Sequence, residues 1–284
     1  MRRSFDDYFK TCTIIADHFG KLRPVSSIHV SDFNSFRGVL AKTRKAVALG
    51  NEINRIRGVF LYAYKADLVD SPIKFGPDFK RPGKKTIRQQ KSQQPKKLFT
   101  ANEVRNLIDA ASEPMRTMIL LGINCGLGNA DCGRMLVSHV DFKSGWLDYA
   151  RGKTGIDRRA KLWDETIAGL KIHCQDREPS QEVFATRHGN SWFKDAGDSP
   201  ISKEFRKLQR ELGIQKAFRG FYSLRHTFET EAAAGLDQPA VDLIMGHEPQ
   251  HISSNYVELI HDKRLASVSK LMRRWLGKLQ KEVS

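Results

Sequence analysis

The chain has 284 residues, 40% of them apolar and 28% charged, and a formal net charge of +16 at pH 7. This length is too great for a typical single core and suits two domains, and the composition excludes a largely disordered protein. So high a positive charge is typical of proteins that bind polyanions. The alternative is a basic housekeeping protein whose charge only keeps it in solution.

Four cysteines lack a CxxC pair or any other metal-ligand spacing: Cys12, Cys125, Cys132 and Cys174. We expect reduced thiols in a soluble, cytoplasmic protein, because the sequence also has no apolar run long enough to cross a membrane and no signal peptide. His247 and His251 have the spacing of zinc ligands on a helix, but Pro249 between them breaks the helix, so we expect no metal site.

Residues 1–79 predict a small all-helical domain. Apolar residues recur at helical spacing in SFDDYFKTCTIIADHF, and Ser31 is expected to be the N-cap of a second helix. A third helix carries an apolar stripe at Ile53, Ile56, Phe60 and Ala63. Arg55 and Arg57 lie off this stripe, where each is either merely solvated or in contact with phosphates.

Residues 80–97, KRPGKKTIRQQKSQQPKK, contain eight basic residues and no acid. Because proline, glycine and glutamine interrupt the segment, we expect an extended linker without a helix. Such a linker is either a solubilising tether or a run of charge that lies along a phosphate backbone and releases counterions on binding. In the second case Lys84, Lys85 and Arg88 are the expected contacts.

A second domain is expected over residues 98–284. Thr100 and Glu103 form a capping-box pair at its start, with Phe99 and Val104 placed for a hydrophobic staple. An apolar helix follows in MRTMILLGINCGL, a short hairpin in WLDYARGKTGIDRRAKLW, a loop in EVFATRHGNSWF, and helices from SKEFRKLQRELGI onward. The expected fold class is mainly α with a small β-sheet.

Four polar positions of the second domain stand out by their order: Lys153 in the hairpin turn, Arg225 in FYSLRHTFET, His247 in IMGHEP and Tyr256 in SSNYVEL. Three of them have simple structural interpretations. A lysine in a turn is usually solvated, a histidine after a glycine can cap a helix, and a tyrosine near a helix start usually packs. Arg225 differs, because an unpaired charge within an apolar helix costs several kcal/mol.

These stretches resemble the tyrosine recombinase (phage integrase) family: GKTG, LRHTFET, IMGHEPQHISSNY, which places Tyr256 nine residues after His247, and FTANEVRNLI. The resemblance extends over nearly the whole chain, since the N-terminal helices look like that family's core-binding domain, which clamps DNA opposite the catalytic domain. It implies site-specific recombination or integration of double-stranded DNA by a homo-tetramer, as in mobile elements. It also implies that no metal or cofactor takes part and that the DNA-bound protein is associated with the nucleoid.

By this resemblance, the Tyr256 hydroxyl attacks the scissile phosphate and forms a 3′-phosphotyrosyl bond, while Arg225 stabilises the phosphate oxygens. Lys153 donates a proton to the leaving 5′ oxygen, and His247 hydrogen-bonds the same phosphate. Arg225 is then tolerated in its helix because it faces a cleft that the phosphate fills. His226 is expected to have a supporting role and not to be catalytic.

Two positions depart from the family pattern. Gly128, in CGLGNADCGRML, stands where relatives carry a first catalytic arginine, and Tyr222 stands where they commonly carry a histidine. Tyr222 can donate a hydrogen bond but cannot serve as a near-neutral base. Losing one preorganised donor at such a site costs about 10²–10³ in rate.

Other arginines are candidates to replace the missing one. Arg134 lies six residues after Gly128, about 240° farther around a helix, and is expected to point elsewhere. Arg151, Arg158 and Arg159 belong to the hairpin, from which a side chain can swing toward the site.

Two hypotheses from different classes follow. The first is an active or weakened recombinase that cuts DNA through Tyr256, which the joint presence of Lys153, Arg225, His247 and Tyr256 favours. The second is a DNA-binding protein on a recombinase scaffold that no longer cleaves, which Gly128 favours. A basic helical interaction protein unrelated to DNA is a third alternative.

Overall fold

The computed structural model describes residues 2–152, 154–195, 199–248 and 259–277. The chain divides into two compact units, Met1–Pro95 and Lys96–Ser284. The first unit therefore takes in most of the segment 80–97 that the sequence sets apart as a linker. None of the described helices is long and apolar enough to cross a membrane.

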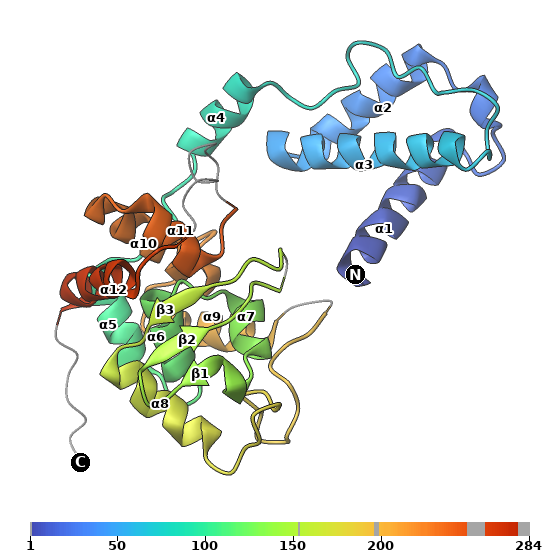
Figure 1. Ribbon diagram of the computed structural model, residues 1–284. Coiled ribbons are helices and arrows are strands. Elements are labelled where there is room, and N and C mark those ends of the chain that lie inside the picture. Colours follow the sequence, from blue (N-terminus) through green and yellow to red (C-terminus); the bar gives the residue numbers. More distant parts are fainter. Residues whose placement is uncertain (1, 153, 196–198, 249–258, 278–284) are drawn as a thin grey trace. The chain divides into compact units, whose positions relative to one another are not determined.

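The first unit is helical, as expected. It contains α1 (Arg2–Phe19), a short 3-10 turn (Val25–Ser27), α2 (Val30–Thr43), α3 (Ala46–Lys65) and α4 (Lys84–Ser92) (Figure 1). Its core is a cluster of aromatic and aliphatic side chains: Phe19, Phe33, Phe36, Leu40, Leu49, Ile53, Ile56, Phe60 and Phe79. The predicted stripe of α3 is thus confirmed at Ile53, Ile56 and Phe60, which face this core.

The start of α2 differs from the prediction. The helix begins at Val30 with His29 as its N-cap, so the expected cap at Ser31 is wrong. The reason is Asp32, whose carboxylate accepts a hydrogen bond from the His29 backbone N–H at 2.9 Å. Arg23 pairs with the same carboxylate at 2.7 Å and holds it in place.

The expectation of an extended segment over 80–97 is also wrong, because residues Lys84–Ser92 form helix α4. Its glycine and prolines lie at positions 82, 83 and 95, outside the helix, and the lysine, arginine and glutamine within it are good helix formers. The backbone N–H of Ala46 at the start of α3 donates to the Gln90 side chain at 2.8 Å. Lys84, Lys85 and Arg88 are exposed on α4.

The second unit is built around α6 (Met115–Asn124), in which every residue except Arg116 is buried. The other helices are α5 (Ala101–Ala110), α7 (Asn129–Arg134), α8 (Asp164–Cys174), α9 (Pro200–Glu211), α10 (Tyr222–Ala232), α11 (Gln238–Met245) and α12 (Asp262–Leu276). Helices α5, α8, α9, α10 and α12 all pack against α6. Figure 1 shows α10, α11 and α12, in orange and red, grouped together near β3.

A three-stranded antiparallel sheet, β1 (Val140–Asp141), β2 (Trp146–Asp148) and β3 (Arg159–Lys161), completes this unit. Leu147 of β2 pairs with Ala160 of β3, which confirms the predicted hairpin. Its ladder continues toward the turn through hydrogen bonds from Tyr149 to the Arg158 carbonyl at 3.0 Å and from Arg151 to the Ile156 carbonyl at 2.7 Å. These bonds extend the hairpin ladder beyond β2 and β3 as far as Arg151 and Ile156.

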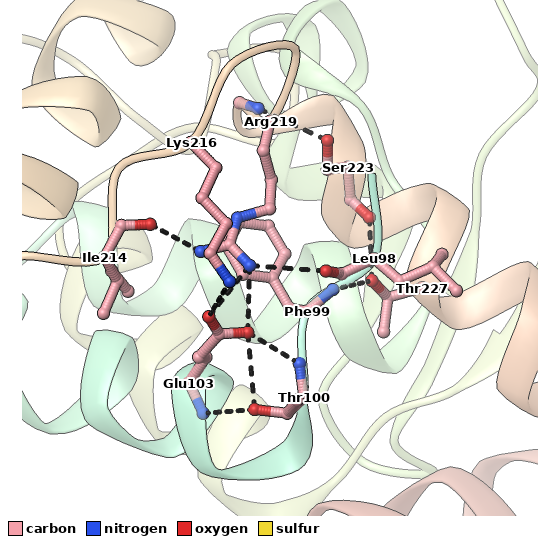
Figure 2. A network of polar contacts seen from close by, with 10 residues as sticks. Leu98, Phe99, Thr100, Glu103, Ile214, Lys216, Arg219, Ser223 and Thr227 are labelled. Atoms are coloured by element: carbon pink, nitrogen blue, oxygen red, sulfur yellow. Dashed lines mark hydrogen bonds and ion pairs between the residues drawn. The ribbon is translucent and has the colours of Figure 1, made fainter. Parts of the chain in front are cut away.

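The predicted capping box at the start of α5 is present. Glu103 accepts from the Thr100 backbone N–H at 2.9 Å, and Thr100 accepts from that of Glu103 at 3.2 Å. Figure 2 shows that the same carboxylate pairs with Arg219, at 2.8 Å, just before α10. Burial alone would raise the pKa of Glu103, but the hydrogen bonds from Thr100 and Arg219 hold it below the ordinary value.

This network fixes α10 relative to the start of the unit. The Phe99 backbone N–H donates to the Thr227 hydroxyl on α10 at 3.0 Å, and the Arg219 guanidinium lies over the Phe99 ring (Figure 2). Because Arg219 is buried and α10 carries Arg225, the network positions the helix on which the candidate site depends.

Candidate active site

Arg225 lies in the core of the second unit, with 2% of its surface exposed. Its guanidinium donates to the Gly126 carbonyl and to the Met245 carbonyl, each at 2.7 Å. Met245 is the last residue of α11, where the helix dipole places negative partial charge that stabilises a cation, and Gly126 follows the C-cap of α6. Among the described residues no carboxylate forms an ion pair with Arg225; two backbone carbonyls hold its guanidinium, and the charge of Asp131 acts on it without direct contact.

His247 is the neighbour of Arg225 in space. It follows Gly246, the C-cap of α11, whose φ of 62° is the left-handed conformation that favours glycine. The His247 Nε2 lies 2.9 Å from an Arg225 nitrogen. Because a guanidinium can only donate, Nε2 accepts in this contact and the ring proton is on Nδ1. Burial, followed by the charge of Arg225, lowers the pKa of His247 and favours this neutral form.

The two departures from the family pattern meet in space. Tyr222 is the first residue of α10 and is 46% exposed, and its ring lies against Gly128. A Cβ added at Gly128 would lie 3.0 and 3.1 Å from two carbons of that ring. Since Gly128 has an extended backbone that any residue can adopt, space and not strain limits the side chain there. A side chain at position 128 would therefore point into the space that the Tyr222 ring occupies.

A buried ion pair near Gly128 was missed by the sequence analysis. Arg158, 3% exposed, donates to Asp131 at 3.1 Å and to the Tyr149 carbonyl at 2.9 Å. The other Asp131 oxygen accepts from the Gly128 backbone N–H at 2.9 Å. The pair thus joins the hairpin to the start of α7. Nothing in the spacing of positions 131 and 158 indicates that they meet.

The structure brings Arg225, His247 and Tyr222 to one region of the second unit. His226 packs edge-on against Tyr222, with ring centroids 5.3 Å apart, as suits a supporting residue. Lys153 and Tyr256, the expected general acid and nucleophile, lie outside the described residues.

The five residues expected to bind DNA all belong to the first unit. Lys84, Lys85 and Arg88 are exposed on α4. Arg55 pairs with Glu52 at 2.7 Å, and Arg57 donates to the Phe79 carbonyl at 3.2 Å and lies over the Phe75 ring. The two arginines of α3 therefore have structural partners within their own unit, whereas α4 presents an open basic face.

Comparison with known protein families gives one match: the model of the phage integrase family fits residues 97–262. No curated protein sequence matches the chain significantly. The match to the family model extends over more than half of the chain, and it includes the hairpin, α10 and α11.

Several solved structures share the fold. The Tn1549 transposon integrase in complex with transposon right end DNA has a TM-score of 0.68 and 13% identity, over 96% of this chain and 95% of that chain. A lambda integrase dimer bound to a COC′ core site has a TM-score of 0.64 and 13% identity, over 90% of this chain and 71% of that chain. A lambda integrase tetramer bound to a Holliday junction has a TM-score of 0.63 and 14% identity, over 89% and 73%.

The mostly helical fold with its small sheet agrees with these structures. Together with the match to the family model, it identifies the chain as a member of the phage integrase family, the tyrosine recombinases.

Proposed function

We propose that this tyrosine recombinase is a site-specific DNA strand transferase that breaks and rejoins duplex DNA through Tyr256. The observation that carries the proposal is the pairing of buried Arg225 with neutral His247. The guanidinium has no carboxylate partner among the described residues and is fixed by two backbone carbonyls. A cation that is preorganised and not neutralised by an acid is suited to bind a phosphate.

The proposed reaction has two balanced steps. The Tyr256 oxygen attacks the scissile phosphorus and loses its proton, and the bond from phosphorus to the 5′ oxygen breaks as Lys153 protonates that oxygen. The phosphodiester bond is thereby exchanged for a 3′-phosphotyrosyl bond of similar energy. A free 5′ hydroxyl from the same or another strand then attacks the phosphorus and returns its proton to Lys153. The bond to the Tyr256 oxygen breaks and that oxygen takes up a proton, which rejoins the DNA and releases Tyr256.

Arg225 and His247 act on the phosphate in both steps. Arg225 stabilises the charge that develops on the non-bridging oxygens. His247 becomes a donor to the same phosphate through reorientation of its ring or through protonation next to the bound anion. Tyr222, at the edge of this region, is proposed to contribute a hydroxyl donor and no base.

The first unit is proposed to clamp the DNA, with α4 as its most direct contact. Lys84, Lys85 and Arg88 fall within about 100° of one another around the helix axis and form one basic face. Neutralising several phosphates releases counterions, so affinity should fall steeply with salt. A homo-tetramer on DNA is proposed by likeness to the lambda integrase tetramer on a Holliday junction.

The direct experiment needs no known target site. Purified protein is incubated with a pool of nicked genomic duplexes, and DNA joined covalently to protein is collected after denaturation, with Tyr256→Phe as the matched control. We expect an adduct with the wild type and none with Tyr256→Phe. Adduct formation that persists in the Tyr256→Phe variant would contradict the assignment of the nucleophile.

The second candidate function is DNA binding without cleavage, which Gly128 favours because a preorganised donor is missing there. It predicts no adduct from the wild type although duplex binding remains salt-sensitive. Replacing Lys84, Lys85 and Arg88 by Gln tests the binding surface that both functions share. We expect weaker binding to all sequences and a salt dependence reduced by up to about three units of slope. Loss of binding to one sequence alone would contradict backbone contact by α4.

A further inference from the structure

Several arginines could replace the one that is missing at position 128. They differ in whether a carboxylate already pairs with their guanidinium group. Arg134 pairs with Asp195 at 3.3 Å and lies 3.5 Å over the Phe193 ring. Arg159 pairs with Asp262 at 2.7 Å and also with Asp148. Both are neutralised by carboxylates, so neither offers a free cation to a bound anion.

Arg158 is close enough to the site but is enclosed. Its side chain is 2% exposed, and Asp131 neutralises its charge. It also lies over the Tyr149 ring, with 4.6 Å between the guanidinium carbon and the ring centroid. A guanidinium held in this way supports the hairpin and cannot reach a DNA backbone without breaking a buried ion pair.

Arg151 is different. It is partly exposed at the end of the hairpin ladder, and its guanidinium donates to the Gly246 carbonyl at 3.1 Å. In the part of the chain that the structure describes, no carboxylate pairs with it. Its stem also lies directly against Gly246, because a Cβ added there would be 3.1 Å from the Arg151 Cβ.

Arg151 and Arg225 therefore hold adjacent peptide groups. Arg225 donates to the carbonyl of Met245 and Arg151 to that of Gly246, immediately before His247. Burial lowers the pKa of Arg225, and the nearby charges of Arg151 and Arg158 act in the same direction, while Tyr222 and Asp131 oppose this shift. Two cations that hold the same turn repel each other, and an anion bound to both relieves that repulsion.

We propose that Arg151 is the second phosphate-binding arginine of this recombinase and takes the place of the arginine missing at position 128. The role of Arg151 in catalysis rests on the proposed strand transfer, whereas its binding of phosphate does not. One non-bridging oxygen of the scissile phosphate binds Arg225 and the other binds Arg151, with His247 between them. The replacement thus comes from the hairpin that also carries Lys153, and not from the start of α7.

The test measures anion binding separately from cleavage. Inorganic phosphate is titrated into the full-length protein, and binding is followed by ¹⁵N NMR of the arginine side chains. We expect the signals of Arg151 and Arg225 to shift together, and Arg151→Gln to weaken phosphate binding about tenfold. The matched control is Arg159→Gln, on the same hairpin, which should leave phosphate affinity unchanged. Equal phosphate affinity in Arg151→Gln and the wild type would overturn the proposal.

The adduct experiment gives the second readout. Arg151→Gln should reduce adduct formation on nicked duplexes at least tenfold while duplex affinity changes less than twofold, because one contact among many is lost. A normal adduct yield from this variant would also overturn the proposal. If the wild type forms no adduct, strand transfer fails as the function, and the phosphate titration still decides whether Arg151 binds the anion.

Discussion

The two sides of the candidate site are built in opposite ways. On the side of α10 and α11, Arg225 is buried, joined to two helix ends and bonded to His247. On the side of α7, Gly128 has no side chain, its backbone N–H donates to Asp131, and the Tyr222 ring lies against it. One side is held by fixed hydrogen bonds around a guanidinium, whereas the other carries an aromatic ring.

The two departures from the family pattern lie against each other. Gly128 and Tyr222 are far apart in the sequence but in contact in the structure, so a ring at 222 and a large side chain at 128 compete for the same space. Under the proposal above, the second cation comes from another element, the hairpin end, where Arg151 donates to the Gly246 carbonyl without a carboxylate partner among the described residues.

The largest expected effect on stability and on adduct formation comes from removing the Arg225 side chain. In Arg225→Ala the carbonyls of Gly126 and Met245 lose their buried donor, and each unpaired group costs roughly 1–3 kcal/mol. We expect a lower free energy of unfolding in urea and complete loss of the covalent adduct. An unfolding free energy equal to that of the wild type would contradict the structural role of Arg225.

The next effect concerns the buried pair behind Gly128. Arg158→Met leaves the Asp131 carboxylate without its cation and should lower the free energy of unfolding by about 3 kcal/mol. Asp131→Asn keeps an acceptor for the Gly128 N–H but carries no charge. The double variant Arg158→Met, Asp131→Asn should therefore be more stable than Arg158→Met alone, and strictly additive losses would show that the pair is not coupled.

A smaller effect is expected from a side chain added at position 128. Gly128→Ala places a Cβ against the Tyr222 ring and should destabilise the protein by about 1 kcal/mol, the low end for overpacking because the ring is half exposed. In a Tyr222→Ala background the same substitution should cost almost nothing. Urea unfolding of the four proteins in this cycle measures the coupling, and a coupling energy near zero would mean that the ring does not limit position 128.

The smallest effect is a pH dependence. The pKa of His247 is lowered by burial and by Arg225 and Arg151, while Glu229 and Asp242 oppose this shift. The unfolded chain therefore takes up the proton at higher pH, so the stabilising contribution is complete above about pH 6.5 and declines as the pH falls further. Between pH 7.5 and 5, the wild type should lose more stability than His247→Gln. An equal loss of unfolding free energy in the two proteins over this pH range would refute the lowered pKa of His247.

Local patterns made much of the fold predictable. The capping box at Thr100, the apolar helix α6 and the hairpin around Lys153 each follow from residues close together in the chain. Composition does not predict helix α4, because its segment contains glycine and proline, but these residues lie at the borders of the helix. In that segment, contact with α3 through Gln90 adds stability that composition does not indicate.

The site was predictable only in part, for a physical reason. The order of Lys153, Arg225, His247 and Tyr256 is a sequence signal, but the partners of Arg225 are backbone carbonyls, which no residue type specifies. The contacts of Tyr222 with Gly128 and of Arg151 with Gly246 join residues distant in the sequence. These contacts depend on tertiary packing, which no local sequence pattern specifies.

The most direct test of strand transfer is to map the covalent bond. The trapped wild-type adduct is digested with protease and nuclease, and mass spectrometry locates the residue that carries the nucleotide phosphate. We predict that the nucleotide is found on Tyr256. A nucleotide found instead on Tyr222, the half-exposed tyrosine beside Arg225, would contradict the account, because Tyr222 would then be the nucleophile and not the ring that replaces an arginine.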